Sequence, residues 1–169
     1  METENFRNNI VVDKTFFNQD QTVKGKEVYK YNKQNELPMG SEFYGPDGSV
    51  LSTYKYEYQD TLKSKSFAYA GTTDELLRIE RFQYDPRGNM VRKMILDENE
   101  VVQKSFMFGH DQYGNEVKMV VTDPDDNIIL SETYEIVTVD ENKRWIEKYG
   151  YVNDNKKPST FYHRIMNDK

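Results

Sequence analysis

The length of 169 residues fits one domain, and the net charge of −6 argues against a nucleic-acid partner. The chain has no cysteine, which excludes disulfides, thiolate catalysis and cysteine-ligated zinc. Only 36% of the residues are hydrophobic, but 14% are aromatic, including 13 tyrosines and 1 tryptophan, and disordered chains contain few aromatic residues. Alanine occurs only at Ala68 and Ala70, whereas strand-favouring Tyr, Phe and Val are frequent, so the composition predicts a folded all-β protein.

Residues 1–16 fit the pattern of the rest of the chain least well. Phe6, Ile10 and Phe16 predict a leading strand or a short capping helix, because the terminal unit of a repeat array is usually atypical. The first five residues, Met-Glu-Thr-Glu-Asn, do not form a secretory signal. We therefore expect a cytoplasmic protein from the sequence as it stands, or a periplasmic or surface protein if a signal peptide was removed.

From residue 17 onward, two series of polar turn clusters alternate, each with a spacing of about 26 residues. One series begins at positions 31, 58, 84, 110 and 139, and the other at positions 17, 44, 70, 96, 122 and 152. Segments of roughly 8–10 residues separate the turns, a length that suits strands. We predict one domain over residues 1–169, with a cap at 1–16 and hairpin repeats over 17–166.

The hairpins are expected to form an antiparallel meander with a strongly twisted sheet. Tyr54, Tyr56 and Tyr58 share one face of their strand, but apolar residues occur on both faces of most segments. The sheet would therefore either curl into a half-barrel or barrel, or form a single layer shielded by long Lys and Glu side chains. The segment Phe161–Met166 is predicted to be the last strand, and no segment is long and apolar enough to span a membrane.

One turn motif carries a family resemblance. The sequence Tyr84-Asp85-Pro-Arg-Gly88-Asn89 resembles the tyrosine-aspartate (YD) repeats of Rhs-type bacterial proteins, and residues 110–115 and 43–48 are further copies. The repeat is also similar to the MORN-like hairpin arrays of some bacterial antitoxins. This resemblance covers most of residues 17–166. It implies a β-hairpin array in a toxin-related context, and it transfers no catalytic residue.

Motifs that carry chemistry are not found. His110 and His163 are predicted to be polar residues of half-buried strands. The oxygen-rich segment Asp123–Asn127 is predicted to be a turn, because it lacks the later bidentate Glu of a calcium loop. There is no nucleophile elbow, phosphate-binding loop or dinucleotide fingerprint. We therefore predict no catalytic residue, no metal, no cofactor and no enzymatic activity.

The aromatic side chains are the remaining candidates for binding. Tyrosine and tryptophan are enriched at interfaces, where the ring packs and its polar group stays hydrated. Thirteen tyrosines in a thin sheet cannot all be buried. The predicted partner-binding residues are Trp145 with Tyr149 and Tyr151 on the same face, followed by Tyr54, Tyr56 and Tyr58.

These observations favour a non-enzymatic protein-binding module. Its most specific form is an immunity or antitoxin protein that neutralises a bacterial toxin by direct binding, with an acidic face against a basic active site. The alternatives are a secreted or surface module that binds carbohydrate or lipid through the aromatic stripe, and a structural repeat fragment of a larger surface protein. Nucleic acid is not expected as a partner.

Overall fold

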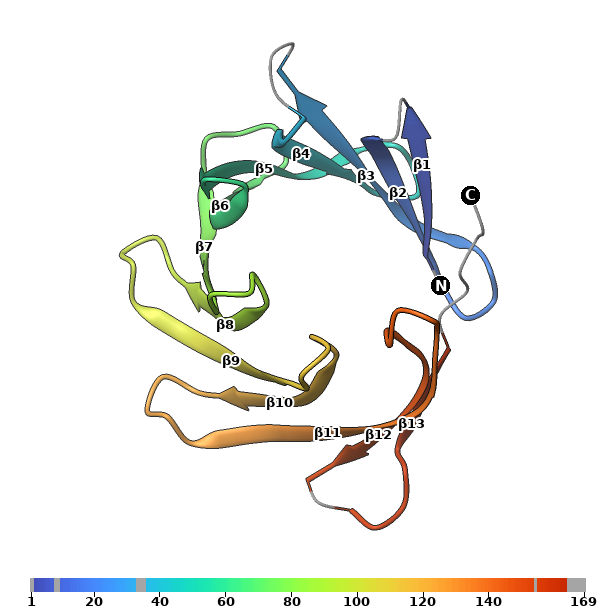
Figure 1. The fold of residues 1–169 in the computed structure, drawn as a ribbon. Coiled ribbons are helices and arrows are strands. Elements are labelled where there is room, and N and C mark those ends of the chain that lie inside the picture. The colour runs from blue at the N-terminus through green and yellow to red at the C-terminus, as the bar shows by residue number, and fades with distance from the viewer. Residues whose placement is uncertain (1, 8–9, 33–35, 154, 164–169) are drawn as a thin grey trace. The chain divides into compact units, whose positions relative to one another are not determined.

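The computed structural model describes residues 2–7, 10–32, 36–153 and 155–163. These residues form thirteen strands and no helix, which confirms the all-β prediction. The strand order in the sheet is the order in the chain, from β1 to β13, so the fold is the predicted antiparallel meander (Figure 1). Among the described residues, β1 and β13 are the two ends of this order.

The strands have the following bounds: β1 Glu2–Arg7, β2 Ile10–Phe17, β3 Val23–Tyr31, β4 Pro38–Tyr44, β5 Val50–Gln59, β6 Leu62–Ala70, β7 Leu76–Tyr84, β8 Met90–Leu96, β9 Val102–His110, β10 Glu116–Thr122, β11 Ile128–Val139, β12 Trp145–Val152 and β13 Thr160–His163. The N-terminal segment thus forms strands, not a capping helix. Of the predicted last strand, residues 164–166 lie outside the described residues.

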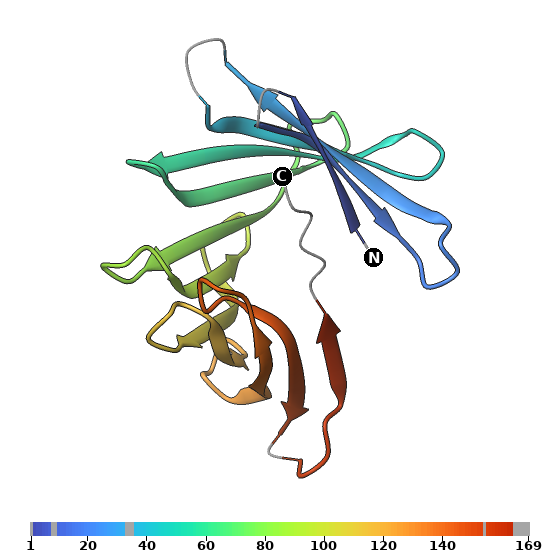
Figure 2. The same cartoon turned by 45° about the vertical axis from the view of Figure 1, so that its right-hand side comes forward.

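The chain divides into two compact units, which we describe separately. Unit 1 contains Met1–Arg81 and Leu96–Val101, and unit 2 contains Phe82–Ile95 and Val102–Lys169. Within unit 1 the strands β1 to β6 run side by side, and within unit 2 the strands β10 to β13 do the same (Figure 2). The prediction that residues 1–169 form one domain stays a prediction.

One tight turn recurs along the chain. In the turn Asp85–Asn89, the first amide N–H donates to the fifth carbonyl at 2.9 Å, and the fourth amide donates to the first carbonyl at 3.0 Å. The fourth residue, Gly88, has a φ of +85°, a region that favours glycine. The same two bonds and a positive φ at the fourth residue occur in the turns 18–22, 45–49, 97–101, 111–115, 123–127 and 140–144.

An aspartate at the first position holds most of these turns. The Oδ1 atom of Asp85 accepts the amides of Arg87 and Asn89, both at 2.9 Å. The other carboxylate oxygen accepts the Asn89 side-chain amide at 2.9 Å. These bonds lower the pKa of Asp85, since they favour its charged form. The spacing of Asp and Asn in the sequence therefore marks a turn in which the aspartate accepts hydrogen bonds from the backbone amides of the turn.

A β-bulge follows the turn on the outgoing strand of most hairpins. Phe43 pairs with Ser52 and Tyr44 pairs with Val50, so Leu51 is an extra residue on β5. Each bulge increases the local right-handed twist, which accounts for the twisted sheet. The pairing registers give equivalent extra residues at Lys24, Met39, Ser64, Leu77, Val117, Ile129 and Ile146.

The interior contains many polar side chains. In unit 1, the Glu27 carboxylate accepts the hydroxyls of Tyr29 at 3.0 Å, Ser41 at 2.6 Å and Tyr56 at 3.1 Å. We call these four residues the Glu27 network. The bond between a Glu and a Tyr two residues later recurs at Glu42–Tyr44 and Glu132–Tyr134. Tyrosines can therefore pack within the sheet because glutamates on the same strand satisfy their hydroxyls.

Candidate functional site

The three predicted tyrosines of β5 are held within unit 1. Tyr54, Tyr56 and Tyr58 are all half-buried. Tyr56 belongs to the Glu27 network, and burial raises its pKa. The Tyr58 hydroxyl donates to the carbonyl of Pro38 at 2.8 Å. The hydroxyls of Tyr56 and Tyr58 thus bind within the protein, and a role of these side chains in binding a partner stays a prediction.

The predicted aromatic face of β12 is divided by a bulge. Ile146 is the extra residue, since Thr138 pairs with Glu147 and Val139 pairs with Trp145. The Trp145 ring therefore lies on the face of Lys148, whose Nζ is 4.8 Å from the ring centroid. In a regular strand, residues 145 and 148 would point to opposite faces.

Tyr149 and Tyr151 lie on the other face of β12. The Tyr149 ring packs on Phe161 of β13, with ring centroids 5.3 Å apart. The Tyr151 hydroxyl donates to the Glu135 carboxylate at 2.5 Å. The expectation that Trp145 shares a face with these two tyrosines is wrong, because strict alternation from the sequence does not account for the bulge.

Lys148 lies in a cage of three aromatic rings. Its Nζ is 3.6 Å from the centroid of Tyr134, 4.8 Å from Trp145 and 5.2 Å from Tyr162. The residue is buried, and ring faces attract an ammonium group most strongly where water is excluded. The three rings come from β11, β12 and β13, so the cage fixes the position of the indole. No pattern in the sequence distinguishes this lysine from the others.

Trp145 and Lys148 line a cleft of about 480 Å³ in unit 2. Its walls combine two aromatic side chains with charged and amide groups. The other lining residues are Asn89, His110, Tyr113, Gly114, Asn115, Glu116 and Arg144.

Asn115 joins two turns beside this cleft. Its side chain is only 6% exposed, and its Nδ2 donates to the Asp111 carboxylate at 2.9 Å and to the Lys143 carbonyl at 2.8 Å. Its Oδ1 accepts the amide N–H of Trp145 at 2.9 Å. One side chain thus connects the turn 111–115 with the turn 140–144.

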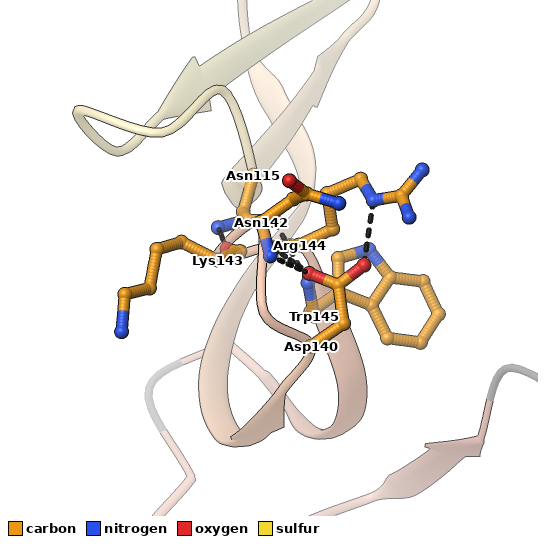
Figure 3. A network of polar contacts seen from close by, with 6 residues as sticks. All are labelled: Asn115, Asp140, Asn142, Lys143, Arg144 and Trp145. Atoms are coloured by element: carbon orange, nitrogen blue, oxygen red, sulfur yellow. Dashed lines mark hydrogen bonds and ion pairs between the residues drawn. The ribbon is translucent and has the colours of Figure 1, made fainter.

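The turn 140–144 also orients an arginine. The Oδ2 atom of Asp140 accepts the Nε–H of Arg144 at 2.7 Å, and its Oδ1 accepts the amides of Asn142 and Arg144. Figure 3 shows the Arg144 guanidinium and the Trp145 indole on the same side of this turn, whereas the Lys143 side chain points away. The backbone of Trp145 is therefore held by Asn115, and the Arg144 guanidinium is held by Asp140.

A second surface lies on unit 1, where the turns that follow even-numbered strands lie along the same end of the strands. The turns 18–22, 45–49, 70–75 and 97–101 contain neither Lys nor Arg. Their acidic residues are Asp20, Asp47, Asp74, Glu75, Asp97, Glu98 and Glu100. We call these four turns, together with Val23, Leu51 and Leu77 on the strands that follow them, the acidic turn edge.

Aliphatic side chains accompany these carboxylates. Each turn ends at, or is closely followed by, an aliphatic side chain that is 43% to 55% exposed, namely Val23, Leu51, Leu77 and Val101. A shallow cleft of about 340 Å³ opens beside Val23, with Lys26, Tyr44 and Pro46 among its other lining residues. Two of these aliphatic residues, Leu51 and Leu77, are the bulge residues of their strands. The turn positions were identified from the sequence, but the segregation of charge at one edge was not.

The described residues contain neither a metal-binding cluster nor a membrane-spanning helix. No group of three or more His, Asp or Glu side chains that could hold a metal ion occurs among them. In the same part of the chain, no helix is long and apolar enough to cross a membrane.

Comparisons with known proteins find similarity only among solved structures. No protein-family model matches the sequence, and no curated protein matches it. Among solved structures, the chain is similar to a chain of the Photorhabdus luminescens Tc holotoxin pore, determined with a mutation in TccC3. The TM-score is 0.41 and the sequence identity is 13%, and the match covers 90% of this chain and 9% of that chain. The present chain therefore matches only a small part of the length of that protein.

Proposed function

We propose that the protein is a non-enzymatic binding module whose partner is a protein with a basic surface, held at the acidic turn edge of unit 1. The observation that carries the proposal is the combination of turns without Lys or Arg and exposed aliphatic side chains beside each of them. Protein interfaces commonly place apolar contacts at the centre and charged groups around them. The basic side chains of a partner would meet the carboxylates.

The shallow cleft gives this surface an anchor point. Val23, Tyr44 and Pro46 form apolar walls, and Asp47 lies within the adjoining turn. Interfaces gain most of their affinity from a few side chains that fill such pockets. An aliphatic side chain of the partner would fill the cleft, and a neighbouring Lys or Arg would reach Asp47.

The most specific form of this proposal is neutralisation of a bacterial toxin. An acidic edge would cover the basic active site of a nuclease-like toxin, and opposite charges would also accelerate the encounter. The resemblance of residues 84–89 to YD repeats supports a toxin-related context. Neutralisation requires only tight binding across the active site, and no reaction by this chain.

Charge reversal tests the proposed surface. Asp74 and Glu98 are exposed, and neither carboxylate forms the backbone bonds that hold the turns. The protein would be co-expressed with the product of the neighbouring gene, and growth and complex formation would be measured. We expect D74K/E98K to weaken the complex about tenfold, which corresponds to about 1.4 kcal/mol, and to reduce the rescue of growth.

The control is Glu141→Lys, which reverses one exposed carboxylate in the turn 140–144 of unit 2 and makes half the charge change of the double variant. It changes the net charge in the same direction but leaves the acidic turn edge intact. Binding by this variant should stay within about twofold of the wild type. Equal losses in both variants, or no loss in either, would contradict the proposed surface. If the neighbouring product neither binds nor is toxic, the toxin-neutralising form is wrong.

A further inference from the structure

We propose that the cleft of unit 2 is a saccharide-binding site in which a sugar ring stacks on the exposed Tyr113 ring and the edge of Trp145. This inference is independent of the proposed function, because it concerns another surface on another unit. A volume of about 480 Å³ lies within the range of about 300–1,000 Å³ that is typical of small-molecule sites.

The aromatic side chains would provide the stacking surface. The Tyr113 side chain is 55% exposed, and Trp145 is half-buried beside it in the same cleft. One face of a pyranose ring presents mainly C–H groups, which pack on aromatic rings, while its hydroxyls remain at the rim of the ring. Rigid aromatic side chains also lose little conformational entropy when a ligand binds.

The charged groups would bind the hydroxyls. Arg144 presents a planar set of N–H donors, and a guanidinium can bind two neighbouring oxygens at once. The Glu116 carboxylate, on the same cleft, can accept hydrogen bonds from hydroxyl groups. A sugar carries adjacent hydroxyls that both donate and accept, so it matches a cleft with both kinds of group.

The binding groups are fixed before a ligand arrives. Asp140 binds Nε of Arg144 at 2.7 Å, and Asn115 binds the Trp145 backbone at 2.9 Å. The contact with Lys148 further fixes the indole. Groups that are already ordered lose less entropy on binding, which raises affinity.

The charges also predict which sugars bind best. Arg144 forms an ion pair with Asp140, and in the described contacts this pair uses only Nε of the guanidinium. The two terminal nitrogens of Arg144 can therefore make the paired bonds that a guanidinium forms with a carboxylate. A sugar with a carboxylate, such as a uronic acid, should therefore bind more tightly than a neutral sugar of the same size.

The single tryptophan gives a direct assay. Trp145 lies in the cleft, so its fluorescence reports on this site alone. The intact protein would be titrated with trigalacturonic acid, maltotriose and chitotriose. We expect a saturable change in emission with trigalacturonic acid and a weaker one with the neutral sugars. Tyr113→Ala should weaken binding about tenfold, the loss expected for an aromatic anchor.

The control variant is Tyr151→Ala, which removes a tyrosine from the opposite face of β12 and should leave affinity unchanged within about twofold. Circular dichroism and thermal melting would establish that both variants fold. Binding of a neutral sugar alone would support the site and overturn the preference for acidic sugars. The proposal is overturned if none of the three sugars binds the wild type, if Tyr151→Ala loses as much affinity as Tyr113→Ala, or if hexaglutamate binds as tightly as trigalacturonic acid.

Discussion

Asn115 should be among the most important polar side chains for the stability of unit 2. It is buried and makes three side-chain hydrogen bonds, two of which reach residues 28 and 30 positions later in the chain. Substitution by alanine would separate the turn 111–115 from the turn 140–144. It would also leave the amide N–H of Trp145 without the acceptor that it has in the native structure.

The expected loss follows from these contacts. The two bonds that Asn115 donates contribute about 1 kcal/mol each to net stability, and the Trp145 amide N–H that loses its acceptor costs a further 1–3 kcal/mol, roughly. Asn115→Ala should therefore lower the free energy of unfolding by about 3–5 kcal/mol. Asn127 occupies the same position in the turn 123–127, but it is exposed and its described side-chain bond goes only to Asp123. Asn127→Ala should cost about 1 kcal/mol.

Urea unfolding measured by Trp145 fluorescence would compare the two variants. The probe is well placed, since the Trp145 backbone binds the Asn115 side chain directly. We expect the free energies of unfolding of the two variants to differ by about 2 kcal/mol or more. Equal destabilisation by Asn115→Ala and Asn127→Ala would show that the bonds between the turns contribute nothing, and that only the local turn matters.

Three further predictions concern the turns and the polar interior. Lys143 adopts a φ of +62° and Gly88 a φ of +85°, so Lys143→Gly should stabilise the protein and Gly88→Ala should destabilise it, each by about 1 kcal/mol in thermal unfolding; opposite signs would refute the strain argument. The side-chain amide bond to Asp123 lowers the pKa of this carboxyl, so its contribution to stability is present above the pKa of an unfolded aspartate and is lost as the pH falls through the folded value. The free energy of unfolding would be measured from pH 6 to pH 2 for the wild type and for Asp123→Asn. The wild type should lose more stability over this range than the variant, and identical profiles would contradict the prediction. Tyr56→Phe removes a hydroxyl from the Glu27 network and should cost about 1–2 kcal/mol in urea unfolding, whereas Tyr113→Phe, at an exposed ring, should cost less than about 0.5 kcal/mol; similar costs would contradict the role of the network.

The architecture could be predicted because its signals are local. Asp85, Gly88 and Asn89 form a turn through bonds within five residues, and copies of that pattern at 26-residue spacing mark the hairpins. Bulges such as the one at Ile146 depend on the register between two strands, and no residue type in the sequence predicts their positions. For that reason the face of Trp145 was predicted wrongly, although its place in a candidate site was predicted.

The rest of the candidate site depends on distant contacts. Asn115 resembles Asn89 and Asn127 in sequence, since each ends a turn that begins with aspartate. Only Asn115 has described bonds to a turn almost thirty residues away, which a local pattern cannot distinguish. Lys148 likewise looks like one more exposed lysine until the strands bring Tyr134 and Tyr162 beside it.

The bond between a glutamate and the tyrosine two residues later has a consequence for how such a chain can change in length. In the pairs Glu27–Tyr29, Glu42–Tyr44 and Glu132–Tyr134, donor and acceptor lie on the same strand. A hairpin that is duplicated or deleted as a whole carries both members of such a pair with it, so the hydroxyl of that pair keeps its acceptor at the new junction. Pairs of this kind favour growth by whole repeats, because their tyrosine hydroxyls do not depend on a neighbouring repeat for an acceptor.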